Sequence, residues 1–107
     1  GPRFRSMSIL QTCSSPARDQ AFMRALIADE LDRVRSALED MGVELCGNPE
    51  IVRAHLGALQ TIDEICQRNE NLARILRAED MFAEADTITL ESLRARMQRA
   101  IARRRAA

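Results

Sequence analysis

Hydrophobic residues recur every three or four positions along most of this chain, which is the spacing of one face of an α-helix. The clearest run lies between residues 49 and 78, where His55, Ile62, Asn69 and Leu76 follow one another at intervals of seven. Apolar residues border this line on both sides, with Ile51, Ala58, Ile65 and Leu72 on one and Val52, Leu59, Cys66 and Ala73 on the other. The pattern predicts a long helix whose broad apolar face carries two polar residues on its midline.

The start of this helix is marked by Asn48, Pro49 and Glu50. Asparagine caps the first turn, proline fits the first helical position, and an acid suits the positive end of the helix. No further proline follows, so we expect the helix to run unbroken to Ala78, over roughly 45 Å. Its polar face is expected to consist of Arg53, Gly57, Gln60, Glu64, Gln67, Asn71 and Arg74.

Asn69 allows two interpretations. The helix could end near Arg68, in which case Asn69 and Asn71 would cap a new helix. The continuous apolar spacing from Ile62 to Leu76 instead favours an unbroken helix. Asn69 then faces its symmetry mate or another buried polar partner, which costs stability and selects the register of the contacting helices.

A second helix is predicted before this one, beginning at Ser15 as the cap and Pro16 as the first residue. We expect Gly42 to end it, because glycine readily adopts the left-handed conformation found at helix ends, and residues 43–47 to be a connector. The apolar residues of one face step by three or four and are Met23, Ile27, Leu31, Val34, Leu38 and Met41.

A third helix follows the capping residues of the segment 86–89. Its shorter apolar strip consists of Leu90, Leu93, Met97, Ala100 and Ile101, and it leads to the basic tail 103–107. Hydrophobic residues make up 46% of the chain but include only three aromatic residues, a composition that suits helix packing better than strands. The predicted fold is therefore all-α, a helical hairpin plus a third helix in a small bundle assembled through the long central helix.

The length of 107 residues indicates one domain, which we place at residues 15–102. Residues 1–6 are interpreted as a tag or vector remnant and residues 7–14 as a flexible arm. Three cysteines without a close pairing favour a reducing, cytoplasmic setting. No apolar run is long enough for a membrane span. All sixteen basic residues are arginine, which we interpret as the coding bias of a GC-rich bacterial genome.

The net charge of zero conceals a strong segregation of charge along the chain. Residues 19–86 carry fifteen acids and seven arginines, for a net charge of −8, whereas residues 87–107 carry one acid and six arginines, for +5. A basic helix of this kind can contact a polyanion, and such contacts would be made by Arg99, Arg103, Arg104 and Arg105. Nucleic-acid binding is nevertheless the less favoured alternative, because no aromatic residue accompanies these arginines and the body of the chain is acidic.

His55 is the only histidine, which excludes metal sites built on histidine clusters. It could serve as the phosphoacceptor of a histidine phosphotransfer domain, but that family has a basic residue three positions after the histidine and a glycine four positions after it. Here those positions are Ala58 and Leu59, and Gly57 lies on another side of the helix. We therefore expect His55 to be buried in a packed interface, and we predict neither catalytic residues nor a cofactor.

These patterns predict a small, non-catalytic helical interaction protein with a regulatory role. It would self-associate, as a homodimer, and bind a protein partner. The apolar face of the long helix would supply the interface, through Val52, His55, Leu59, Ile62, Ile65, Asn69, Leu72 and Leu76.

Overall fold

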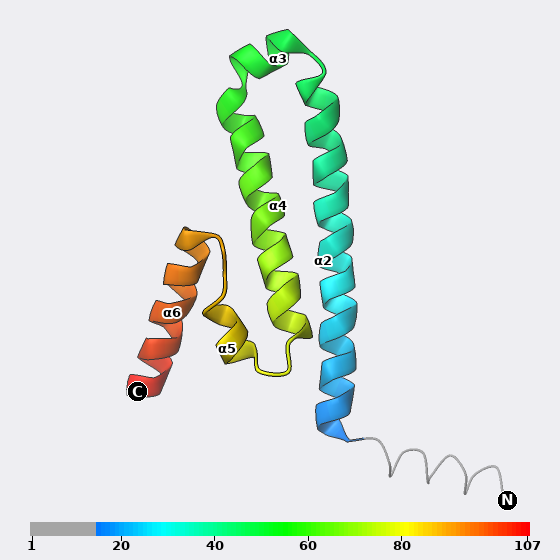
Figure 1. Cartoon of the computed structure of the whole chain (residues 1–107). Coiled ribbons are helices and arrows are strands. Elements are labelled where there is room, and N and C mark those ends of the chain that lie inside the picture. Colours follow the sequence, from blue (N-terminus) through cyan, green and yellow to red (C-terminus); the bar gives the residue numbers. More distant parts are fainter. Residues whose placement is uncertain (1–14) are drawn as a thin grey trace, which may run out of the picture.

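A computed structural model describes residues 15–107 and confirms an all-α fold. The remnant and the arm predicted for residues 1–14 lie outside the described residues. Figure 1 shows two long helices side by side as a hairpin, with the remaining helices at its tip and along one side. The described helices are α2 (Pro16–Cys46), α3 (Pro49–Ala54), α4 (Leu56–Arg77), α5 (Met81–Ala85) and α6 (Glu91–Ala106).

Helix α2 begins as expected and ends later than expected. The Ser15 hydroxyl accepts a hydrogen bond from the Arg18 N–H at 3.0 Å, which caps the first turn. The helix continues through Gly42 to Cys46, so the predicted stop at Gly42 and the connector over residues 43–47 are wrong. Gly42 lies inside the helix, where a Cβ atom would come within 3.6 Å of Ile62 of the neighbouring helix. That distance is an ordinary van der Waals contact, so Gly42 is required neither for packing nor for chain reversal.

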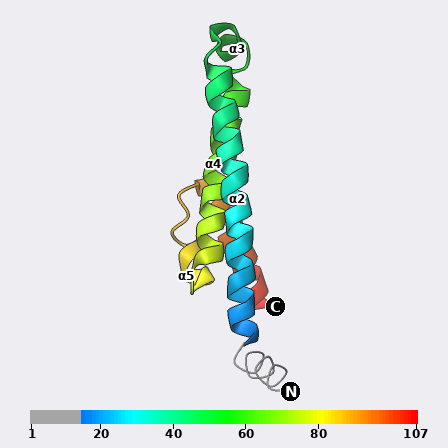
Figure 2. The same ribbon diagram turned by 90° about the vertical axis from the view of Figure 1, so that its right-hand side faces the viewer.

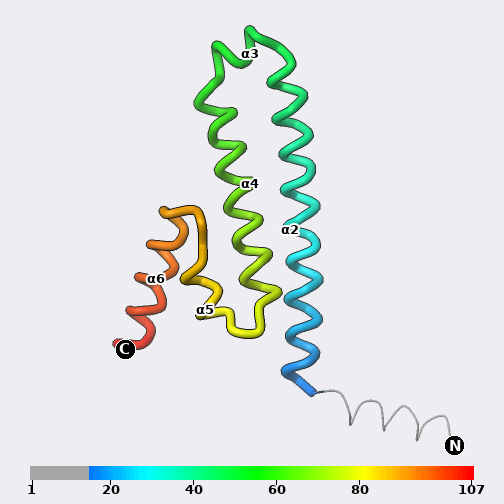
Figure 3. Tube along the Cα trace, in the orientation of Figure 1, coloured from blue at the N-terminus to red at the C-terminus, as the bar shows by residue number. Residues whose placement is uncertain are grey.

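The long central helix is not continuous at its start. α3 is capped by Asn48, whose side chain accepts from the Glu50 N–H at 3.0 Å, and it ends at His55. His55 has φ −131° and ψ 33°, outside the helical region, and α4 begins at the next residue. In Figure 3 the trace of α3 crosses the tip of the hairpin before α4 turns back along α2. The chain must bridge the gap between two helix axes here, and an unbroken helix from Pro49 cannot make that turn.

Beyond this break, α4 runs without interruption from Leu56 to Arg77. The prediction of continuity through Asn69 is therefore confirmed, and the alternative of a cap at Asn69 is excluded. α4 is antiparallel to α2, because it begins beside the end of α2 and its last turn lies beside the first half of α2. Seen edge-on in Figure 2, α4 lies largely behind α2, so that the hairpin is one layer of helices thick.

The largest group of buried residues lies between α4, α5 and α6, and not inside the hairpin. It consists of Ile75, Ala85, Ile88 and Leu93. The sequence pattern does not predict the short helix α5, which brings Ala85 into this core. Asp80 caps this helix, because its carboxylate accepts a hydrogen bond from the Ala83 N–H at 3.0 Å. The predicted third helix is confirmed as α6. It continues to Ala106, so the basic segment is the last turn of a helix and not a separate tail.

Candidate interaction surface

On α4, the side chains buried against α2 recur at seven-residue intervals. On α2, Ala28 is fully buried, and on α4 Leu59, Cys66 and Ala73 are buried in turn. The Cys66 thiol donates to the backbone carbonyl of Arg35 with an S···O distance of 3.8 Å. Burial raises the pKa of this thiol, and the nearby Glu39 and Asp63 carboxylates raise it further. Cys66 is therefore held as a neutral packing residue and not as a nucleophile.

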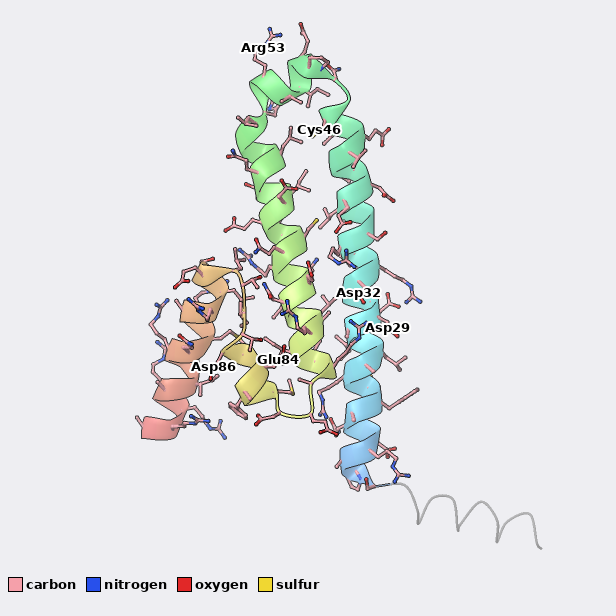
Figure 4. All side chains as sticks on the ribbon, in the orientation of Figure 1. Asp29, Asp32, Cys46, Arg53, Glu84 and Asp86 are labelled. Carbon is pink, nitrogen blue, oxygen red and sulfur yellow. The ribbon has the colours of Figure 1, made fainter. Side chains whose placement is uncertain are left out.

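An ion-pair cluster joins the open end of the hairpin. Arg77, at the end of α4, donates to Asp29 at 2.7 Å and to Asp32 at 2.6 Å, both on α2. Hydrogen bonds to the two carboxylates raise the pKa of the guanidinium. Figure 4 shows Asp29 and Asp32 on the stretch of α2 beside the end of α4. Each of these side chains is about a third to a half exposed, so the cluster aligns the helices more than it stabilises them.

Asn71 fixes the chain between α5 and α6 onto α4. It is 2% exposed, although it was predicted to lie on the polar face of the helix. Its amide donates to the Thr89 hydroxyl at 3.2 Å, and its carbonyl oxygen accepts from the Thr89 N–H at 3.3 Å and from Arg74 at 3.2 Å. Sequence reasoning missed this residue because its partners come from a loop that the helical pattern does not place.

The first half of the candidate surface is a strip of hydrophobic side chains along α2 that no described residue covers. Met23, Ile27, Val34 and Met41 are each between 45% and 53% exposed. The sequence predicts a single face for these residues together with Leu31 and Leu38, but only Leu31 and Leu38 are half-buried toward α4. At 100° per residue the four exposed side chains lie within about 40° of one another and roughly 100–140° away from Ala28, which faces α4. The predicted face is therefore split between a covered and an uncovered part.

The second half of the surface is the midline of α4. The edge of its broad apolar stripe that contains Cys66 faces α2, and the edge that contains Ile75 faces α5 and α6. Between these edges lie the midline residues Ile62, Asn69 and Leu76 and the border residues Ile65 and Leu72, all of them only half-buried. Leu72 also packs against the core between α4, α5 and α6.

Both strips lie on the same broad side of the hairpin. On each helix the strip is reached by turning away from the inter-helix contact in the same rotational sense, by roughly 125° from Ala28 on α2 and roughly 80° from Cys66 on α4. Because α2 and α4 are antiparallel, equal senses of rotation lead to the same side, whereas the ion pairs of Arg77 lie toward the opposite side. We refer to this set as the hairpin face, which consists of Met23, Ile27, Val34 and Met41 of α2 with Ile62, Ile65, Asn69, Leu72 and Leu76 of α4.

Five of the eight predicted interface residues belong to the hairpin face. Of the other three, Leu59 is buried against α2, and Val52 is half-buried in α3. His55 is exposed at the helix break, so the prediction that it is buried on the midline is wrong for the chain described. Sequence reasoning also missed the α2 strip as part of the surface, because it assigned those residues to the core.

The arginines predicted to contact a polyanion are all exposed on α6. They are Arg99, Arg103, Arg104 and Arg105. Arg105 lies over the ring of Phe82, 5.4 Å from its centre, which ties the last turn of α6 to α5. In the middle of α6, Gln98 donates to Asp86 at 3.3 Å, and Figure 4 shows Asp86 at the end of α5 near α6. At least one of the four arginines therefore has a structural contact.

Comparison of the chain with models of protein families, with curated proteins and with solved structures gave no match. Among the described helices, none combines the length and the apolarity needed to cross a membrane.

Proposed function

We propose that the protein is a non-catalytic interaction protein with a regulatory role, which self-associates and binds a protein partner through the hairpin face. The observation that supports this most directly is the exposure of a row of large hydrophobic side chains along α2. Ala28 is the only buried residue in this helix of 31 residues. Contiguous apolar patches of several hundred Å² are uncommon on isolated proteins and mark sites of protein contact.

The polar side chains also support a binding function. The hydrogen bonds between Asn71 and Thr89 and those of Arg77 join one part of the fold to another. They position α2 and α6 relative to α4. The hairpin face, in contrast, contains one polar side chain from α4, Asn69, within an apolar surface, as is usual where helices pack with a defined register.

Sedimentation of the full chain at micromolar concentration tests the proposal. We expect a species of twice the 12.0 kDa mass of one chain. Val34→Glu places a charge in the middle of the α2 strip and should shift the protein to monomers without loss of helical circular dichroism. Ser36→Glu is the matched control, because Ser36 is exposed on the other side of the same helix. A wild-type protein that sediments as one chain at all accessible concentrations would contradict self-association.

A further inference from the structure

The spacing of the hairpin face specifies how it would be covered. We infer that the hairpin face is occupied by the same face of a second copy. The two copies are related by a two-fold axis that passes between the two Asn69 side chains. In this arrangement α2 packs antiparallel on the partner's α2, and α4 packs antiparallel on the partner's α4. This inference rests on the proposed self-association and adds the identity and orientation of the occupant.

The first observation is the symmetry of the α4 strip about Asn69. Ile62 and Leu76 are each seven residues from Asn69, and Leu72 and Ile65 are three and four residues away on either side. When two such strips pack antiparallel with Asn69 at the centre, apolar residues meet apolar residues along the whole length. Any shift of the register places the Asn69 amide against an apolar side chain and leaves it without a partner.

The second observation is the position of the α2 strip. Its outermost members, Met23 and Met41, have their midpoint at Asp32. Cys66 of α4 lies at the level of Arg35 of α2, where its thiol contacts the backbone. Because the two helices are antiparallel, moving three residues forward from Cys66 on α4 corresponds to moving three residues back from Arg35 on α2. Asn69 therefore lies at the level of Asp32. The centres of both strips therefore coincide at one height, and one two-fold axis brings both helices into register with their copies.

The third observation is the charge beside the centre of the α2 strip. Glu30 is ion-paired with Arg33 of the same helix, and both side chains are about 70% exposed. In the antiparallel arrangement centred near Asp32, Glu30 of each copy lies close to Arg33 of the other copy. A parallel arrangement would place Glu30 beside Glu30 of the second copy, which is unfavourable. Charge complementarity therefore selects a second copy in the antiparallel orientation.

Disulfide cross-linking in a cysteine-free background, Cys13→Ser, Cys46→Ser and Cys66→Ala, tests the orientation. Asn69→Cys alone should form a covalent dimer on mild oxidation, because the two positions meet at the axis within the short range that a disulfide allows. Met23→Cys and Met41→Cys should each remain uncross-linked alone and should form a covalent dimer when mixed. Ser36→Cys, on the other side of α2, is the control that should not cross-link.

Each variant is first sedimented under reducing conditions. If the reduced proteins are dimers but Met23→Cys cross-links with itself, the helices are parallel and the inference is wrong, while the proposed function stands. A cross-link between Met23→Cys and Leu76→Cys in separate chains would show that α2 packs on α4, with the same consequence. The inference is also wrong if the reduced proteins are dimers but no disulfide forms, either in Asn69→Cys alone or in the mixture of Met23→Cys and Met41→Cys. If the reduced cysteine-free protein and the wild type are both monomers, the proposed self-association itself fails.

Discussion

At the scale of single residues, the two asparagines of α4 have opposite roles. Asn71, predicted to be solvated, is buried and fully hydrogen-bonded to Thr89 and Arg74. Asn69, predicted to be inside an interface, is half-exposed in the described chain. A helical wheel places both correctly on the helix surface, but it does not show which side of the helix receives the chain that follows.

We expect Asn71→Ala to lower the free energy of unfolding by about 1–3 kcal/mol, because it removes the hydrogen bonds by which a buried side chain holds the N–H and hydroxyl of Thr89. Chemical denaturation followed by circular dichroism measures this loss. Gln60→Ala, at an exposed position of the same helix, should change the stability by no more than about 0.5 kcal/mol. Equal effects of the two substitutions would show that the contact between Asn71 and Thr89 does not hold the loop.

A second prediction at this scale concerns the cysteines. Cys66 is buried with a raised pKa, whereas Cys46 is exposed. In a Cys13→Ser background, a thiol reagent at neutral pH should therefore modify Cys46 rapidly and Cys66 only when the protein unfolds. Because the folded state raises the pKa of Cys66, its neutral thiol contributes stability at low pH. That contribution should be lost progressively as the pH rises above the ordinary pKa of a thiol and through the raised pKa of Cys66 in the folded state. Rapid modification of both cysteines in the folded protein would contradict this packing.

At the scale of the elements, Gly42 of α2 lies beside Ile62 of α4 without being needed for the contact between the two helices. A glycine inside a helix is less favourable than alanine by roughly 0.5–1 kcal/mol. A Cβ atom at Gly42 would meet Ile62 at 3.6 Å, an ordinary contact distance, and at Gly57 it would meet nothing within 4 Å. Gly42, which the sequence pattern interprets as a helix end, is therefore a residue that α2 accommodates in its interior.

We expect Gly42→Ala to raise the free energy of unfolding by about 0.5–1 kcal/mol, as measured by urea denaturation. Gly57→Ala, in the first turn of α4, is the matched control and should give a gain of similar size or smaller. If Gly42→Ala destabilises the protein while Gly57→Ala does not, α2 and α4 pack more closely at Gly42 than the structure shows.

At the scale of the whole molecule, the arginine-rich end of α6 and the hairpin face are separate regions. The hairpin face lies on α2 and α4, while the arginine-rich end of α6 lies on the far side of α4 from α2. The two regions can therefore be removed independently. Arg105 contacts Phe82, so the end of α6 contributes to the fold locally, but none of its residues belongs to the hairpin face.

Deletion of residues 103–107 should leave the dimer intact, since these residues are remote from the hairpin face. Sedimentation of the shortened chain checks this. The same deletion tests the alternative function, because a contact of Arg103, Arg104 and Arg105 with DNA or RNA would give an affinity that falls steeply with salt. Loss of such an affinity on deletion would favour nucleic-acid binding over the interaction function proposed above.

The sequence by itself determined the all-α class, the caps at Ser15 and Asn48, and the continuity of α4 through Asn69. These features depend on local hydrogen bonds and on the helical period, which are set by neighbouring residues. Only the tertiary structure decided which apolar strips are covered. The same spacing places Leu31 toward α4 and Val34 away from it, and it leaves His55 exposed at a turn that the two helix axes require. Coverage depends on how the rest of the chain folds back, and a helical period carries no information about that.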